Sequence, residues 1–279
     1  MKFIKRLVVI LSLSLILNCS GNEEEKIVLD SRDLESQMIE SYEKGLKALK
    51  EGDVLFAAKN FNNVENLYPQ SIWAPRSLLM AAYSYYSQDY YGDAISELNR
   101  FIKTYPNSKD ISYAYYLLAT SYYELIIDEK KDLSPLNKSK KNYNFIIENY
   151  PNSDFALDAK FKIVLIDNIL ASKELYIARY YQNKQKWIPA LNRLNYIIDE
   201  YDETQYVEEA IHRLVEINHK IGLISEAEKY AALLGYNYQS SEWYKKSYSI
   251  FNKDYEDPIK KIKKDKQNII IKKFKSLFE

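Results

Sequence analysis

A four-residue pattern, Tyr-Pro-x-Ser, recurs along the chain and constrains its fold more than any other feature. It occupies residues 68–71, 105–108 and 150–153, and weaker copies stand at 201–204 and 238–241. Proline ends a helix and moves the residue before it out of the helical region, whereas a serine two residues later can cap the next helix. The copies follow one another at steps of 37 to 51 residues, as expected of a repeat array.

Glycines between the patterns divide each unit into two helices. Gly52, Gly92 and Gly222 follow or border helical segments, and glycine suits a left-handed helix end. Two helices per unit is the plan of the tetratricopeptide (TPR) repeat, whose period is about 34 residues. The sequence therefore predicts an all-α, right-handed α-solenoid of about five TPR-like helix-turn-helix repeats. We expect the repeats at about 31–70, 71–107, 108–152, 153–203 and 204–240, followed by a terminal helix at 241–251.

Residues at fixed distances before each pattern support this phase. Small residues recur at two positions where paired helices must approach closely, and a large residue recurs at a third. The first small set is Ala57, Ala94, Ser139, Ala190 and Ala227. The second, after allowing an insertion in the third unit, is Gly45, Ala82, Ala119, Ala178 and Val215. The large set is Phe61, Leu98, Tyr143 and Leu194. Chance alanines in ordinary amphipathic helices are the alternative.

One segment is expected to form a single long helix. Residues 154–182 contain neither proline nor glycine, which predicts one helix joining two repeats.

The N-terminus has the features of an export signal that ends at a cysteine. Residues 1–18 begin with basic side chains and continue with an apolar run, as secretory signal peptides do. Residues 16–19, Ile-Leu-Asn-Cys, resemble a bacterial lipobox, although Asn18 replaces the usual small residue. We therefore expect lipidation of Cys19, the one cysteine of the chain, with residues 19–30 as a polar tether. The alternative is a free thiol at the signal boundary. Ser20 follows Cys19 in place of an acidic residue. By the sorting rule of typical Gram-negative lipoproteins, this favours the periplasmic face of the outer membrane.

Charge is balanced overall but unevenly distributed. The chain has 39 basic and 39 acidic residues, with a net charge of +3 in 1–18, −7 in 19–252 and +4 in 253–279. A negative repeat region argues against a nucleic-acid platform. The tail at 252–279 is rich in lysine, and two interpretations of it stay open. It is either an amphipathic helix on an anionic surface or partner, or a disordered end.

The sequence contains no motif that indicates catalysis. It has no Gly-rich phosphate loop, no Cys-x-x-Cys, no His-Glu-x-x-His and no Gly-x-Ser-x-Gly elbow. His212, Glu216 and His219 share one helical face, so a metal site is conceivable. We favour hydrated side chains on the inner face of a repeat, because no further ligand is indicated. The prediction is a protein that is no enzyme and holds neither a metal nor a cofactor.

The repeat phase also predicts which side chains line the concave side, since the first helix of each TPR pair faces inward. In the first three units these candidates for a peptide groove are Tyr42, Arg76, Leu79, Tyr83, Tyr86, Tyr113, Tyr116 and Tyr123. Tyrosine combines apolar area with a hydrogen-bonding tip, which suits an extended peptide, and Arg76 can receive a carboxylate. With 27 tyrosines in the chain, composition and ordinary packing are the alternative explanation. Inner positions of the last two units are polar, namely Arg179, Glu209, His212, Glu216 and His219.

Four features together resemble the BamD family, also called ComL, of outer-membrane assembly lipoproteins. They are the signal with its lipobox, Tyr-x-x-Gly at 42–45, the segment 101–108, and the segment 170–181. The resemblance covers about residues 19–250. This sequence departs from the family pattern at Asp202 and Gln239, where prolines are usual, and in its lysine-rich tail.

The resemblance implies a periplasmic subunit of the machinery that folds β-barrels into the outer membrane. The N-terminal repeats would recognise unfolded barrel precursors, and the C-terminal repeats would dock on the periplasmic domains of the central barrel subunit, beside accessory lipoproteins. The polar inner positions from Arg179 to His219 are then the candidates for docking. The alternatives are another periplasmic TPR scaffold lipoprotein in cell division or envelope coordination, and a cell-wall enzyme with a helical superstructure.

Overall fold

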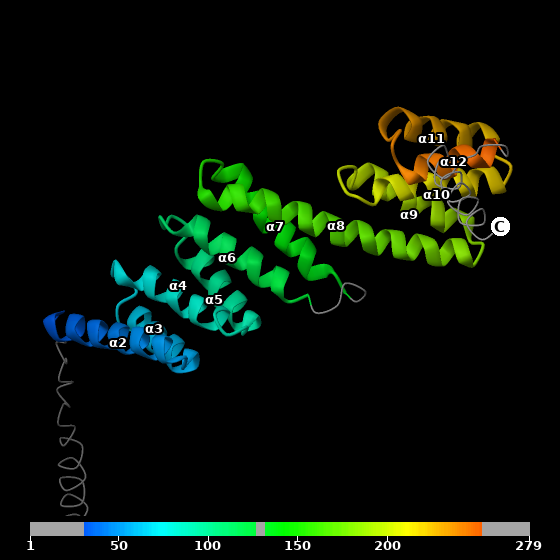
Figure 1. Cartoon of the computed structure of the whole chain (residues 1–279). Helices are drawn as coiled ribbons and strands as arrows, with labels where there is room; N and C mark the ends of the chain where they lie inside the picture. The colour runs from blue at the N-terminus through cyan, green and yellow to red at the C-terminus, as the bar shows by residue number, and fades with distance from the viewer. Residues whose placement is uncertain (1–30, 127–131, 253–279) are drawn as a thin grey trace, which may run out of the picture.

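The computed structural model describes residues 31–126 and 132–252, and these are helical with no strand among them. The helices pair in chain order as antiparallel hairpins that pack on their neighbours (Figure 1). They are α2 (Ser31–Glu51), α3 (Val54–Leu67), α4 (Trp73–Tyr86), α5 (Tyr91–Thr104), α6 (Ile111–Glu124), α7 (Ser134–Asn149), α8 (Asp154–Asn183), α9 (Trp187–Glu200), α10 (Val207–Lys220), α11 (Ile224–Asn237) and α12 (Glu242–Phe251). The predicted all-α solenoid of TPR-like helix pairs is confirmed. Cys19 and the tail after residue 252 lie outside the described residues.

The serines of the recurring pattern cap helices as predicted. The Ser153 hydroxyl oxygen accepts a hydrogen bond from the Ala156 N–H at 3.2 Å, and that of Ser241 accepts one from the Trp243 N–H at 3.1 Å. Ser71 does the same for the amide three residues after it, at 3.1 Å. Each of these bonds satisfies an amide that the first turn of a helix leaves without a partner. The pattern therefore starts a new helix as well as ending the previous one.

Two of the three glycines occupy the backbone conformation predicted for them. Gly52 and Gly222 have φ angles of 84° and 86°, in the left-handed region. The prediction is wrong for Gly92, which lies inside α5. In the turn between α4 and α5, Asp89 adopts the left-handed conformation instead, with φ 64°. Gln185 does so in the turn between α8 and α9. Aspartate tolerates this region because its short polar side chain bonds locally; here it accepts a hydrogen bond from a neighbouring tyrosine hydroxyl.

The small and large residues of the repeat phase all lie inside the helix contacts. Both small sets and the large set are buried, as the phase required. Gly45 of α2 faces the ring of Phe61 in α3, and the Ser139 hydroxyl donates to the Ala119 carbonyl across the α6–α7 contact at 2.8 Å. Small side chains allow the two backbones of a pair to approach, and the large residue fills the space beside them. This contact is repeated along the solenoid.

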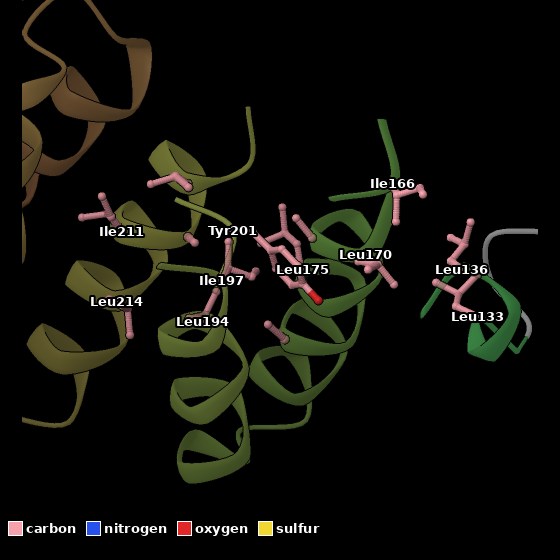
Figure 2. Close-up of a cluster of buried hydrophobic side chains, with 14 of the residues drawn as sticks. Leu133, Leu136, Ile166, Leu170, Leu175, Leu194, Ile197, Tyr201, Ile211 and Leu214 are labelled. Carbon is pink, nitrogen blue, oxygen red and sulfur yellow. The ribbon is translucent and has the colours of Figure 1, made fainter. Parts of the chain in front are cut away.

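The core is divided along the array, as in other solenoids where each repeat contacts only its neighbours. One cluster surrounds Phe61 between α2, α3 and α4, and a second surrounds Leu98 and Phe101 between α4, α5 and α6. The largest extends from α6 to α11. Figure 2 shows its centre, where Leu175 of α8 meets Ile197 of α9.

The predicted long helix is confirmed as α8, which has 30 residues and is therefore about 45 Å long. Its N-terminal half packs on α6 and α7, and its C-terminal half packs on α9. Figure 1 shows α8 linking the stack of α2–α7 to the group of α9–α12. Within the described ranges, no helix combines the length and the apolarity that a membrane span requires.

Gly45→Ala tests the repeated contact. A Cβ atom at Gly45 would lie 2.8 Å from the buried Phe61 ring, which has no space to move into. We expect the free energy of unfolding, measured by urea denaturation, to fall by about 2 kcal/mol. Gly92→Ala is the control, because a Cβ there meets no atom within 4 Å, and its stability should not decrease. Equal stability of the Gly45 variant and the wild type would show that close approach is not required.

Candidate functional site

Aromatic side chains from α4, α6 and the start of α8 lie close together where the sequence predicted the peptide groove. We call Tyr83, Tyr86, Tyr113, Tyr116 and Phe155 the aromatic face. The rings of Tyr113 and Tyr116, from α6, lie 5.4 Å and 5.2 Å from that of Phe155 at the start of α8. The hydroxyls of Tyr83 and Tyr86, from α4, are near enough to that of Tyr113 to interact with it electrostatically. The face therefore spans α4, α6 and α8.

The aromatic face is neither sealed in the core nor fully in solvent. Tyr83 is exposed, and Tyr86, Tyr113 and Tyr116 are half-buried. Leu79, which the sequence placed in the same groove, is only 8% exposed and belongs to the core between α4, α5 and α6. That assignment is corrected, because Leu79 points into the helix contact and offers little surface to a ligand. The four tyrosines of the face are packed against their neighbours, and part of each ring stays accessible to solvent.

The hydroxyls of Tyr86, Tyr113 and Tyr116 stay protonated at neutral pH. Burial raises the pKa of Tyr113 to about 12. Burial, followed by the hydrogen bond to Asp158, raises the pKa of Tyr116 to about 12. Burial and the negative charge of Glu124 also raise the pKa of Tyr86. The Tyr116 hydroxyl donates to Asp158 Oδ2 at 2.7 Å. The face thus presents neutral phenols, which can donate hydrogen bonds, beside apolar ring area.

Tyr42 and Arg76 form a smaller group at the N-terminal end. The Tyr42 ring packs edge-on against Phe61 and Trp73, with both centroids at 5.3 Å. The Arg76 guanidinium carbon lies 6.0 Å from the centre of the Tyr42 ring, within reach of a cation–π contact. Arg76 is exposed, and no carboxylate among the described residues pairs with it. The guanidinium is therefore positioned by an aromatic ring and accessible to an anion.

Sequence reasoning missed the part of this site that α8 supplies. Phe155 and Asp158 contact the tyrosines of α6, and the Lys162 ammonium lies 5.4 Å from the Tyr123 ring centre. The inner position predicted for the fourth unit was Arg179, in the C-terminal half of α8, so the N-terminal half of this helix was left out of the predicted groove. The spacing of Phe155, Asp158 and Lys162 places them on one helical face directly after a capping serine, and this signal was available.

A polar network joins the C-terminal units. Arg179 of α8 and Arg213 of α10 both donate to Glu209 Oε1, from their Nε atoms, at 2.9 Å and 2.7 Å. Gln182 of α8 donates from Nε2 to Glu216 Oε2 at 3.2 Å. Burial alone would raise the pKa of Glu209, but the hydrogen bonds from both arginines outweigh it and hold that pKa below its usual value. The network thus connects α8 to α10 through a buried carboxylate.

The structure corrects the interpretation of His212 as a hydrated inner-face side chain and the choice of Glu209 and His212 as docking candidates. His212 is 5% exposed, its Nδ1 lies 2.8 Å from the Ser247 hydroxyl oxygen, and its ring lies beside that of Trp243. Glu209 is buried between the two arginines. The physical reason is that α12 packs on α10 and covers the face that the repeat phase left open. Neither side chain is available to a partner in this arrangement.

The remaining docking candidates keep part of their surface accessible. Arg179 is exposed, and Glu216 and His219 are half-buried. The His219 ring stands edge-on to Phe251, with centroids 5.5 Å apart. His212 Nε2 lies 3.5 Å from Glu216 Oε1, and this contact is the main reason that the pKa of Glu216 is lowered. Across residues 31–126 and 132–252, no group of three or more His, Cys, Asp or Glu side chains is placed to hold a metal ion.

Comparison with known proteins gives a family match over most of the described chain. Residues 34–233, from α2 into α11, match the family YfiO, described as outer membrane lipoprotein. The outer membrane protein assembly factor BamD of Rickettsia prowazekii (strain Madrid E) is 38% identical over 250 residues, covering 90% of this chain and 98% of that protein. The protein of the same name from Caulobacter vibrioides is 33% identical, covering 85% and 77%.

Among solved structures, the similar chains include the TPR2AB domain of yeast Sti1 in its complex with pHSP90. It has a TM-score of 0.41 and 16% identity, and the match covers 77% of this chain and 81% of that one. MamA has a TM-score of 0.34 and 16% identity, with coverage of 74% and 98%.

Glu209→Gln tests the polar network. The substitution removes the carboxylate that Arg179 and Arg213 share and leaves Arg213 only the more distant Glu216, at 3.7 Å. We therefore expect the free energy of unfolding at neutral pH to fall by about 2 kcal/mol. A depressed folded-state pKa contributes stability above the unfolded pKa and loses it as pH falls. Wild-type stability should therefore decrease below about pH 4.5, the ordinary value for Glu, and the variant should show less of this decrease.

The matched control is Glu228→Gln, which removes an exposed carboxylate on α11 that has no ion pair within the described ranges. Its stability should stay close to that of the wild type at each pH. If the two variants show the same unfolding free energy and the same pH profile, the network does not stabilise the C-terminal units.

Proposed function

Because the chain belongs to the YfiO/BamD family of outer membrane lipoproteins, we propose that it is a non-catalytic subunit of the outer-membrane β-barrel assembly complex. In this role it binds unfolded barrel precursors with its first three units and docks on the central barrel subunit with its last two. The observation that carries the proposal is the match, over nearly the whole chain, to proteins named as outer membrane protein assembly factors. The surfaces described above supply the chemistry for both contacts.

The aromatic face suits the chemistry of a barrel precursor. Strands of outer-membrane barrels alternate apolar and polar residues and carry aromatic girdles near the membrane interfaces. An unfolded strand therefore presents rings and aliphatic groups at every second residue, with backbone carbonyls between them. The half-buried rings of Tyr113 and Tyr116 offer stacking area, and the neutral Tyr113 hydroxyl can donate to a carbonyl, whereas that of Tyr116 donates to Asp158. Arg76, held by Tyr42 and without a carboxylate partner among the described residues, supplies a cation for a terminal carboxylate.

The C-terminal units offer a different surface, which fits a folded partner. A surface cavity of about 450 Å³ is lined by side chains of α8, α9, α10 and α12, including Trp187, Glu216, His219 and Lys220. The Lys220 ammonium lies 5.0 Å from the Trp187 ring centre. The buried network beneath keeps these helices together. Together with exposed Arg179, this mixed polar and aromatic surface is the proposed dock for periplasmic domains of the central subunit and for accessory lipoproteins.

Attachment to the membrane is proposed to come from lipid on Cys19, which lies outside the described residues. This places the solenoid on the periplasmic face of the outer membrane, at the end of the tether 19–30. The runner-up function, a periplasmic TPR scaffold in cell division or envelope coordination, would use the same repeats and the same anchor. Co-purification of an outer-membrane barrel protein that has periplasmic domains distinguishes the proposed function from this runner-up.

Tyr83→Ala with Tyr116→Ala tests the aromatic face. The pair removes one exposed ring and one half-buried ring, so we expect the affinity for synthetic C-terminal peptides of barrel proteins to fall at least about tenfold. Fluorescence anisotropy gives the affinity, and circular dichroism shows whether the helices are intact.

Arg76→Gln tests the recognition of a terminal carboxylate. The wild type should bind a peptide with a free C-terminal carboxylate better than the amidated peptide, and Arg76→Gln should abolish this preference.

Tyr236→Ala is the control for the double tyrosine variant, because Tyr236 is an exposed tyrosine on α11, away from the aromatic face. It should bind peptide as the wild type does. Unchanged peptide affinity in a folded Tyr83→Ala/Tyr116→Ala variant would refute the groove, and an equal preference of the wild type for free and amidated peptides would refute the role of Arg76.

Cys19→Ser tests the anchor and the assembly together. We expect the wild type to sediment with membranes after a high-salt wash and to co-purify with an outer-membrane barrel protein that has periplasmic domains. The variant should move to the soluble fraction, because the solenoid lacks its acyl chains. Retention of the washed variant on membranes would contradict lipid anchoring. Absence of any such barrel protein from the wild-type preparation would contradict the assembly role and favour the runner-up.

A further inference from the structure

The outer side of the N-terminal half of α8 carries an apolar stripe that no described helix covers. Leu157, Phe161, Val164 and Leu165 are 62%, 65%, 48% and 50% exposed. Their spacing places them on one face of the helix, within about two turns. Single exposed apolar residues are ordinary, but four neighbouring ones along one helix face indicate a surface that is normally covered. We call these four residues the outer stripe.

The continuity of α8 explains why the outer stripe is exposed. In a regular array each helix is covered on both sides by helices of its own and neighbouring units. The chain runs straight through residues 154–183 and turns back only at α9, which packs on the C-terminal half of α8. The N-terminal half is therefore covered by α6 and α7 on one side only. Figure 1 shows α8 crossing between the two groups of helices. Among the described residues, no helix packs on this side of the N-terminal half of α8.

Negative charge borders the outer stripe. Val164 lines a small surface cavity of about 80 Å³ together with Glu200, Asp202 and Glu203 at the end of α9. These three carboxylates are exposed, and none of them has an ion pair within residues 31–126 and 132–252. The C-terminal end of α9, at Glu200, adds the negative end of a helix dipole. The uncovered surface thus combines an apolar helix face with an acidic loop, which we define as Glu200, Asp202 and Glu203.

The C-terminal tail of this chain has the complementary composition. Residues 253–279 contain nine lysines and five acidic residues. Six of their apolar residues share one helical face, and five of the eight lysines from Lys260 onward lie outside this face, whereas Lys263, Lys266 and Lys273 lie on it. The apolar positions that share one helical face are Ile259, Ile262, Ile269, Ile270, Phe274 and Leu277. A helix with this pattern would place isoleucines against the outer stripe and lysines near the acidic loop.

The tail is long enough to reach the outer stripe. The described chain ends at Asn252, directly after α12, and Ile250 lines the same cavity as Gln182 and Asn183 at the C-terminal end of α8. From Gln182 back to Leu165 the distance along the helix axis is about 26 Å. Residues 253–258 span about 20 Å when extended, and a helix over 259–278 is about 30 Å long. Running antiparallel to α8, such a helix would overlie the outer stripe.

We propose that residues 253–279 fold back on the same molecule as an amphipathic helix that covers the outer stripe of α8, with its lysines beside the acidic loop. The tail then packs on the side of α8 that no helix of the described residues covers. It completes the solenoid where its two groups of helices join, and it neutralises the acidic loop. This inference is independent of the proposed function, because it concerns an intramolecular contact away from the aromatic face.

A cross-linking experiment tests this contact in the full chain with Cys19→Ser as background. Leu165→Cys with Ile270→Cys should form an intramolecular disulfide under mild oxidation at least about tenfold faster than the control pair, because the tail is held beside α8. The control pair is Leu55→Cys with Ile270→Cys, since Leu55 on α3 is 55% exposed and lies at the far end of the array. Neutralising Glu200, Asp202 and Glu203 as amides should slow the first reaction severalfold.

A second measurement does not depend on disulfide geometry. Alkylation of Leu165→Cys should accelerate when residues 253–279 are deleted, whereas alkylation of Leu55→Cys should not change. The proposal is overturned by equal cross-linking rates in the two pairs, or by an alkylation rate that is indifferent to the deletion. It is also overturned if the cross-link forms only between two copies, or if Leu165→Cys is protected only after anionic phospholipid vesicles are added. Circular dichroism of each variant confirms that the helices are intact.

Discussion

The close approach of paired helices at small side chains is the contact on which the rest of the structure depends. Gly45 against Phe61 in the first unit shows the constraint in its strictest form, because not even a methyl group fits between them. Ala94, Ser139, Ala190 and Ala227 repeat it along the chain. Since every pair has this contact, the two helices of each unit pack in the same way, and the core forms as successive local clusters. The same constraint turns one face of each first helix away from its partner.

This face changes character along the array. In the first three units it carries tyrosines whose rings are held by their neighbours and whose hydroxyls stay neutral. In the last two units the corresponding side chains are engaged in a network around Glu209, and α12 covers part of it. A surface of fixed rings with accessible edges suits an extended, unfolded chain. A surface with its charges internally paired suits a rigid, folded partner. The physical difference between the two ends matches the two contacts proposed for an assembly subunit.

The unbroken helix α8 connects these two regions and influences both. Its first turns provide Phe155 and Asp158 to the aromatic face, and its last turns provide Arg179 and Gln182 to the polar network. Because it continues for 30 residues without a turn, no other helix of the described residues covers the outer stripe. One local feature of the sequence, a long segment without proline or glycine, thus has three separate consequences in the folded chain.

The sequence by itself determined the helices, their pairing, the capping serines and the contact residues, because all of these depend on interactions within a few residues or on a spacing repeated in every unit. Only the tertiary structure decided what covers each face. Helical phase gave the side of the helix on which Leu79, Glu209 and His212 lie, but their burial depends on α5, α6 and α12, which pack there from elsewhere in the chain. The same holds for Phe155, which contacts Tyr116 from the N-terminal half of α8, where the repeat phase predicted no groove residue. A repeat period in the sequence specifies the direction in which a side chain points. Its exposure depends on which helices pack against that side, and the period does not contain this information.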